Sequence, residues 1–264
     1  MSLTIFCVLF LSISGSLLVL ASVDLAAGGT KIRLATEAAT PPLSYVGKDG
    51  QLTGFDVDIG NALCAVMAAE CVWVVEDWDS IIPGVNQYRY DAIVSSLPMD
   101  DATREKVVFT NRYHVQPATF IGAETMAVPE INKETLTDKM IGVQAGSVHE
   151  AFLRDNFGDI AAIKPYELVA QATLDMVGQR LDLVFGDRIE LENNFLNTEE
   201  GRGFKPLGPS YTDAKWFGDG AGIALRKTDK ALMARFNMAL DTIRTNGTYK
   251  KINDRYFDFD VFGN

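Results

Sequence analysis

The chain has 264 residues, which is enough for one large domain or two smaller ones that each bury a core. Hydrophobic residues make up 47% and charged residues 22%, a balance typical of a globular protein. The formal net charge of −11 argues against a nucleic-acid partner, because that binding depends on basic contacts to phosphate, and it disfavours docking to an anionic membrane surface.

The first 27 residues have the composition of a secretory signal peptide. Residues 3–20 are almost all apolar or small, and the small residues Ala26 and Ala27 follow, so we expect cleavage around 26–29. No Lys or Arg precedes the apolar stretch, so a retained membrane anchor is the alternative. No later apolar stretch has spanning length, and we expect the processed protein to be soluble.

After the leader, short apolar runs alternate with amphipathic segments, the pattern of an α/β protein with mainly parallel strands. Several runs are apolar throughout, as buried parallel strands tend to be. Six runs are predicted to be strands: 31–36, 72–75, 92–95, 119–121, 140–143 and 182–185.

Helices are expected between these strands. Asp56 or Asp58 is predicted to cap one helix and Asp79 a second, while Ser147 and Glu150 have the spacing of a capping box at the start of a third. A long helix over about 229–244 is predicted to stop at Asn246-Gly247, before a short final helix.

The cysteines predict a disulfide. Cys7 lies in the leader, so Cys64 and Cys71 remain as an even pair in what should be an oxidising compartment. Two cysteines without a nearby His do not complete a tetrahedral metal site. We therefore expect a structural bridge, no metal and no cofactor.

Polar or aromatic residues follow five of the predicted strands. In open α/β sheets, ligands bind beyond the carboxyl ends of the strands, so these residues together predict one site. They are Glu37, Asp77, Trp78, Asp79, Ser95, Ser96, Gln144, Ser147 and Asp187.

Several segments resemble the periplasmic amino-acid-binding proteins, especially the lysine/arginine/ornithine, histidine and opine binders. The resemblance covers residues 31–263 and implies a monomeric, periplasmic solute-binding component of an ABC importer, with an inner-membrane permease as partner. The matching segments are 54–59 (GFDVDI), 79–83 (DSIIP), 90–96 (YDAIVSS), 142–147 (GVQAGS), 247–249 (GTY) and 256–260 (YFDFD).

The family fold is α/β, with two lobes of the periplasmic-binding-protein type II that close around the ligand like a hinge. The resemblance places two extended crossovers near 115–118 and 215–221. Residues 1–27 are then the signal peptide, 28–115 and 221–264 form lobe 1, and 116–220 form lobe 2. In basic-amino-acid binders of this family, a disulfide stands at the position of Cys64 and Cys71.

The resemblance also assigns the groups that would hold the ligand's carboxylate. Arg104, after a one-residue shift, matches an arginine that grips both carboxylate oxygens, and Ser147 would offer a backbone N–H at a helix N-terminus. Ser95 and Ser96 match contacts to the ammonium and carboxylate groups. Pro98 stands where relatives offer a backbone N–H, which proline lacks.

Two acids and one aromatic residue would recognise the cationic groups. Asp187 matches the family acid that binds the α-ammonium, and Glu37 matches an acid at the distal end of the cleft. Trp78 aligns with an aromatic residue that stacks on the ligand, which is worth about 0.5–2 kcal/mol for a guanidinium. Without the resemblance, we would interpret Trp78 as a buried core residue and Asp187 as a helix cap.

The ligand class follows from this charge balance. The predicted site contains two acids, Glu37 and Asp187, and one base, Arg104. These charges match an amino acid that has one carboxylate and two positive groups, such as arginine, ornithine, lysine or histidine. They disfavour acidic amino acids, whose second carboxylate would face an acid. The segment Gln144-Ala145-Gly146 and the combination of Glu37, Trp78 and His149 resemble opine binders especially closely, which leaves an octopine- or nopaline-like ligand as the alternative. Val148 completes the predicted site.

Two other functional classes are weaker alternatives. An enzyme of the cyclohexadienyl-dehydratase type on the same fold would need a proton-transfer group, for which Glu37 and His149 are the candidates. The sequence contains no independent catalytic constellation, so we expect no enzymatic activity. The second alternative is a sensor domain that passes a signal to a membrane receptor, and this role would need a separate membrane protein as partner.

Overall fold

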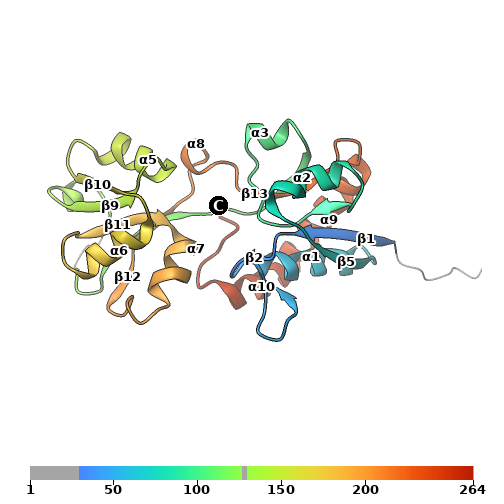
Figure 1. Ribbon diagram of the computed structural model, residues 1–264, viewed down its shortest axis with the longest axis horizontal. Coiled ribbons are helices and arrows are strands. Elements are labelled where there is room, and N and C mark those ends of the chain that lie inside the picture. The colour runs from blue at the N-terminus through green and yellow to red at the C-terminus, as the bar shows by residue number, and fades with distance from the viewer. Residues whose placement is uncertain (1–29, 127–129, 264) are drawn as a thin grey trace, which may run out of the picture.

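The computed structural model describes residues 30–126 and 130–263, which fold into two α/β lobes lying side by side (Figure 1). The predicted signal peptide lies outside the described residues. Within those ranges, no helix has both the length and the apolar character needed to cross a membrane.

Each lobe is built on a five-stranded sheet. The first-lobe sheet has the spatial order β5 (Glu70–Val75), β1 (Lys31–Thr36), β6 (Ala92–Ile93), β13 (Ala221–Leu225) and β7 (Val108–His114). The second-lobe sheet has the order β10 (Ala162–Tyr166), β9 (Met140–Gln144), β11 (Leu183–Asp187), β8 (Ala118–Ala123) and β12 (Phe204–Tyr211). A small antiparallel sheet of β2 (Ala39–Thr40), β3 (Ser44–Val46) and β4 (Leu52–Thr53) adjoins the first lobe.

The sheets are mainly parallel, as predicted, with one reversed strand in each. β13 pairs antiparallel with β6 and β7, and β8 pairs antiparallel with β11 and β12. Both reversed strands are the first to enter their sheet after the chain crosses between lobes. The two reversed strands therefore start at the sheet edge where the parallel strands end. In each lobe this edge faces the other lobe.

Helices cover both faces of each sheet, which explains the apolar character of the central strands. The first-lobe helices are α1 (Phe55–Val66), α2 (Trp78–Asn86), α3 (Asp101–Arg104), α9 (Lys230–Thr245) and α10 (Thr248–Tyr256). The second-lobe helices are α4 (Lys133–Leu136), α5 (Val148–Phe157), α6 (Val169–Val177), α7 (Arg188–Leu191), the π-helix η1 (Glu192–Leu196) and α8 (Ala214–Phe217).

Two predicted helix caps are wrong. The cap of α1 is Gly54, so Asp56 lies inside the first turn and is buried, and the cap of α2 is Asp77 rather than Asp79. The chain enters α1 through Gly54 at φ 125°, and a side chain there would collide with the carbonyl of Leu43. This close approach, which spacing alone does not reveal, moves the helix start ahead of Asp56.

The chain passes between the sheets twice, and its C-terminal segment returns to the same place (Figure 1). β7 ends at His114 in one sheet and β8 begins at Ala118 in the other. The backbone N–H of Val115, between these strands, donates to the carbonyl of Val261 at 2.7 Å. The segment after α10 therefore braces the first crossover.

The C-terminal segment also touches the second lobe. The guanidinium of Arg188, the first residue of α7, lies 3.7 Å from the ring centroid of Phe259 and 3.2 Å from the Asp258 carboxylate. The same side chain binds Glu192 on its own lobe at 2.7 Å. Arg188 thus links the second lobe to the C-terminal segment of the first.

A disulfide joins Cys64 to Cys71, as predicted, and ties the end of α1 to β5 across a sequence separation of 7. The double variant Cys64→Ala/Cys71→Ala should lose about 2–3 kcal/mol of unfolding free energy, because the unfolded chain gains the entropy of an open loop. Urea denaturation of the mature protein measures this loss. Reduction of the wild-type protein should lower the midpoint equally, and an unchanged midpoint in both experiments would contradict a stabilising bridge.

Candidate functional site

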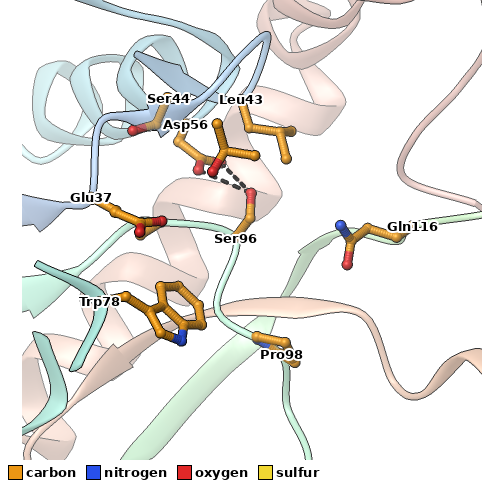
Figure 2. Close-up of a pocket in the computed structure, with 10 residues that line it drawn as sticks. Glu37, Leu43, Ser44, Asp56, Trp78, Ser96, Pro98 and Gln116 are labelled. Carbon is orange, nitrogen blue, oxygen red and sulfur yellow. Dashed lines mark hydrogen bonds between the residues drawn. The ribbon is translucent and has the colours of Figure 1, made fainter. Parts of the chain in front are cut away.

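A cavity of about 390 Å³ opens on the first lobe, beyond the carboxyl ends of β1 and β6 (Figure 2). Parallel strands place their last residues at one edge of a sheet, which is where ligand sites form in open α/β folds. Among the ten lining residues, only Glu37 and Asp56 carry ionisable side chains. The lining residues are Glu37, Thr40, Leu43, Ser44, Asp56, Trp78, Ser95, Ser96, Pro98 and Gln116.

Glu37 and Trp78 lie on the same side of this cavity, and Gln116 lies opposite (Figure 2). Glu37 directly follows β1, and its backbone N–H donates to the Ser95 hydroxyl at 3.0 Å. Trp78 begins α2 and keeps 43% of its surface exposed, although an indole would normally be buried. Both side chains are therefore available to a ligand.

Ser95 and Ser96 have different surroundings. Ser95 is buried, and its hydroxyl anchors the turn after β1 rather than pointing freely into the cavity. Ser96 adopts a left-handed backbone conformation with φ 51°, which is uncommon for a residue other than glycine. Its hydroxyl lies 2.9–3.0 Å from both carboxylate oxygens of Asp56.

Arg104 does not line the cavity, although Pro98 does. The Nε of Arg104 donates to the carbonyl of Met99 at 3.0 Å, and a terminal nitrogen donates to Asp219 at 2.8 Å. Asp219 lies in the segment that leads from α8 back to β13. In this arrangement the guanidinium connects α3 to the second crossover.

The remaining five predicted residues lie together in the second lobe. β9 and β11 are parallel neighbours, so Gln144 and Asp187 stand at the same edge of the sheet, and α5 begins just after β9. None of these residues lines the first-lobe cavity. The candidate site is thus divided between facing lobes, with the second-lobe part comprising Gln144, Ser147, Val148, His149 and Asp187.

Ser147 caps α5 as predicted. Its hydroxyl accepts from the backbone N–H of Glu150 at 3.2 Å and donates to the carbonyl of Gln144 at 2.7 Å. The next residue, Val148, is 52% exposed, so the start of α5 is open to solvent. A helix N-terminus of this kind favours a carboxylate.

Asp187 caps α7, accepting from the backbone N–H of Glu190 at 2.8 Å. Burial raises the pKa of Asp187 to about 6, because the ionised carboxylate is poorly solvated there. A nearby ammonium group would favour the ionised form. The capping role therefore leaves room for a second role toward a cationic ligand.

His149 packs among aromatic rings at the start of α5. Its ring centroid is 5.8 Å from that of Phe185 and 5.6 Å from that of Phe217. This burial lowers the pKa of His149 to about 4, so the imidazole is neutral at pH 7.

Asp56 is the site residue that the sequence prediction misplaced. It is 1% exposed, lies between the buried residues Phe55 and Val57, and accepts a hydrogen bond from the Tyr113 hydroxyl at 2.8 Å. The available signal is an acid between two apolar residues, Phe55 and Val57, but the spacing predicts a helix cap at this position. Ser44, Leu43 and Gln116 were also missed, since the lining of a cavity depends on loop paths.

Residues 32–259 match the model of the family described as bacterial extracellular solute-binding proteins, family 3. This match spans nearly all of the described fold. The chain belongs to this family.

Two curated members of this solute-binding family match at high coverage. The L-arginine-binding protein of Pseudomonas aeruginosa is 43% identical over 233 residues, covering 88% of this chain and 90% of that protein. The lysine/arginine/ornithine-binding periplasmic protein of Escherichia coli is 35% identical over 237 residues, covering 88% and 89%.

Solved structures of solute-binding proteins share the fold. The unliganded, open L-cystine solute receptor of Neisseria gonorrhoeae matches with a TM-score of 0.78 at 19% identity, covering 90% of this chain and 97% of that chain. An ancestral arginine-binding protein bound to arginine matches with a TM-score of 0.55 at 25% identity, covering 87% and 99%.

The surroundings of His149 lead to a prediction about its titration. In NMR spectra of the unliganded protein, the imidazole of His149 should show no titration between pH 5.5 and 8, because its pKa lies at about 4. Phe217→Ala should admit water to the ring and raise this pKa toward 6.5. A wild-type midpoint near 6.5 would contradict the buried, neutral assignment.

Proposed function

We propose that this chain is the periplasmic solute-binding component of an ABC importer and that its cleft binds an amino acid with a cationic side chain. The acidic floor of the first-lobe cavity is the main support: Glu37 and Asp56 line it together with the exposed ring of Trp78, and none of its lining residues is basic. The relatives named for binding arginine and lysine/arginine/ornithine support the same ligand class. Cleavage of the predicted signal peptide would deliver the protein to the periplasm.

The two half-sites would act together through hinge closure. We place lobe 1 at residues 28–115 and 221–264, and lobe 2 at 116–220. Closure would bring Asp187 and the start of α5 toward the floor formed by Glu37 and Trp78. The ligand's side-chain cation would then face Glu37 and Trp78, its α-ammonium would face Asp187, and its carboxylate would meet the N–H groups at Ser147 and Val148.

An opine remains a second candidate because of Thr40. This small, exposed residue lines the cavity where a larger side chain would narrow it. A thermal-shift panel of arginine, lysine, ornithine, histidine, octopine, nopaline and glutamate separates the candidates. Ligand at 100 times its Kd stabilises by about 2.7 kcal/mol, which such an assay detects. Stabilisation by glutamate alone would exclude the cationic class.

The relatives are named as binding proteins, and we propose that this chain likewise has no enzymatic activity. His149 packs against Phe185 and Phe217, and this packing does not favour a role as an acid–base group. Incubation with prephenate or arogenate followed by product analysis tests this proposal, since turnover would contradict it.

The acidic floor predicts charge-selective effects of Glu37→Gln. Affinity for L-arginine should fall at least tenfold, which corresponds to about 1.4 kcal/mol, because the cation loses its carboxylate partner. Affinity for the uncharged analogue citrulline should change less than threefold. Calorimetric titration measures both, with Glu105→Gln as a matched control on the exposed surface. Equal losses for both ligands would contradict charge recognition by Glu37.

In our proposal, Arg104 leaves Asp219 to contact the ligand carboxylate with both terminal nitrogens. Their ion pair is exposed, with 43% and 59% of the side-chain surfaces accessible, and such pairs contribute at most about 1 kcal/mol. Arg104→Ala should therefore weaken L-arginine binding at least tenfold, whereas Asp219→Ala should leave affinity unchanged or higher. Calorimetry on both variants decides the assignment, because equal weakening would mean that the pair only supports the hinge.

A further inference from the structure

A buried chain of hydrogen bonds lies directly beneath the cavity floor. It connects the first turn of α1, the turn after β6 and the end of β7. The Ser96 hydroxyl, which contacts the Asp56 carboxylate, also lies 2.9 Å from Nε2 of His114. Nδ1 of His114 lies 3.1 Å from the carbonyl oxygen of Val115. Asp56 is 1% exposed and His114 is fully buried.

The hydrogen positions in this chain can be counted from its geometry. A carbonyl oxygen only accepts, so Nδ1 of His114 carries a hydrogen, and Nε2 of the neutral ring must accept. The Ser96 hydroxyl has one hydrogen but faces two acceptors, Nε2 and the Asp56 carboxylate. All contacts are satisfied only when one further proton is present, on Asp56 or on Nε2.

Tyr113 does not supply that proton. Its hydroxyl accepts from the backbone N–H of Ser96 at 2.7 Å and gives its single hydrogen to Asp56 at 2.8 Å. The aspartate therefore still needs either a proton of its own or the hydrogen of Ser96, which Nε2 also requires.

The electrostatic surroundings favour Asp56 as the holder of the proton. Burial raises the pKa of Asp56 to about 7 and lowers that of His114 to about 4, because neither buried group is well solvated when charged. The other titratable groups that face Asp56 are Tyr113 on β7, Tyr249 on α10 and the carboxyl group of Glu37 across the cavity. None of these groups provides a positive charge.

We propose that Asp56, Ser96 and His114 form a proton-holding site in the cleft floor, and that a cationic ligand releases its proton on binding. The ligand's positive charge takes the place of the proton: the O–H bond of Asp56 breaks, the proton passes to solvent, and the carboxylate faces the cation. Ser96 continues to donate to Nε2 of His114, and Tyr113 continues to donate to Asp56. This inference rests on the proposed function for its ligand.

The consequence is a ligand affinity that depends on pH. Below pH 7 the proton competes with the ligand, so the affinity for arginine should fall by up to tenfold for each pH unit. Above pH 7 Asp56 is already ionised, and the affinity should be independent of pH until other groups titrate. A neutral ligand such as citrulline should show neither the proton release nor this slope.

Calorimetric titration with L-arginine at pH 6, in buffers of different ionisation enthalpy, measures the protons released. We expect close to one proton per arginine for the wild-type protein and none for Asp56→Asn, which cannot release one. Asp58→Asn is the matched control, because Asp58 lies on the same helix but binds Tyr256 and Arg255 instead of facing the cavity. Release below 0.2 proton in the wild type, or equal release in Asp56→Asn, would overturn the proposal.

A second measurement needs no ligand. In carbon NMR of protein labelled at the aspartate carboxyls, one resonance should titrate with a midpoint near 7 and disappear in Asp56→Asn while persisting in Asp187→Asn. If no panel ligand binds, the proposed function fails, but this titration still tests the proton site. Absence of such a resonance would overturn the proposal even if arginine binds.

Discussion

The packing of the first turn of α1 against the end of β7 joins the cavity floor to the crossovers. The ring of Phe55 stacks at 6.2 Å from that of Tyr113 and meets the rings of Tyr249 and Phe257 edge-on. The Tyr249 hydroxyl donates to the carbonyl of Tyr113 at 2.6 Å. Residues from α1, β7, α10 and the C-terminal segment thus form one buried unit. The acid in the cavity floor and the segment that leads to the second lobe are positioned together.

The same unit explains why Asp56 can be buried at all. An isolated ionised carboxylate in such a place would be costly, since burial removes its hydration. The hydrogen bond donated by Tyr113 replaces part of that hydration, and a retained proton, which Asp56 shares with the Ser96 hydroxyl oxygen, removes the charge. In the proposed scheme, the cavity floor below pH 7 holds a neutral Asp56 until a cationic ligand displaces its proton.

Six strands of the two five-stranded sheets are predictable from the sequence, but β7, β10, β12 and the central strand β13 are not among the predicted runs. All six predicted strands exist, because buried parallel strands are short apolar runs. β7, β10 and β12 lie at sheet edges and contain polar residues or proline, as edge strands commonly do, so their sequences resemble loops. Glu37, Trp78 and Ser96 follow predicted strands, and the structure places all three at one cavity because strand ends meet at one edge of a sheet.

The remaining differences between the predicted and the observed site concern the direction of a side chain and how deeply it is buried. Arg104 was assigned from its distance along the chain after Ser95 and Ser96, yet α3 aims its guanidinium at Met99 and Asp219. The sequence predicts Asp56 or Asp58 as a helix cap, whereas the turn at Gly54 makes Gly54 the cap and places Asp56 inside the first lobe. Both differences depend on how a short connection is directed by residues distant in sequence. The consequence is chemical: the only ionisable side chains in the cavity lining are two acids, Glu37 and Asp56, so the cavity itself offers no basic partner to a ligand's carboxylate.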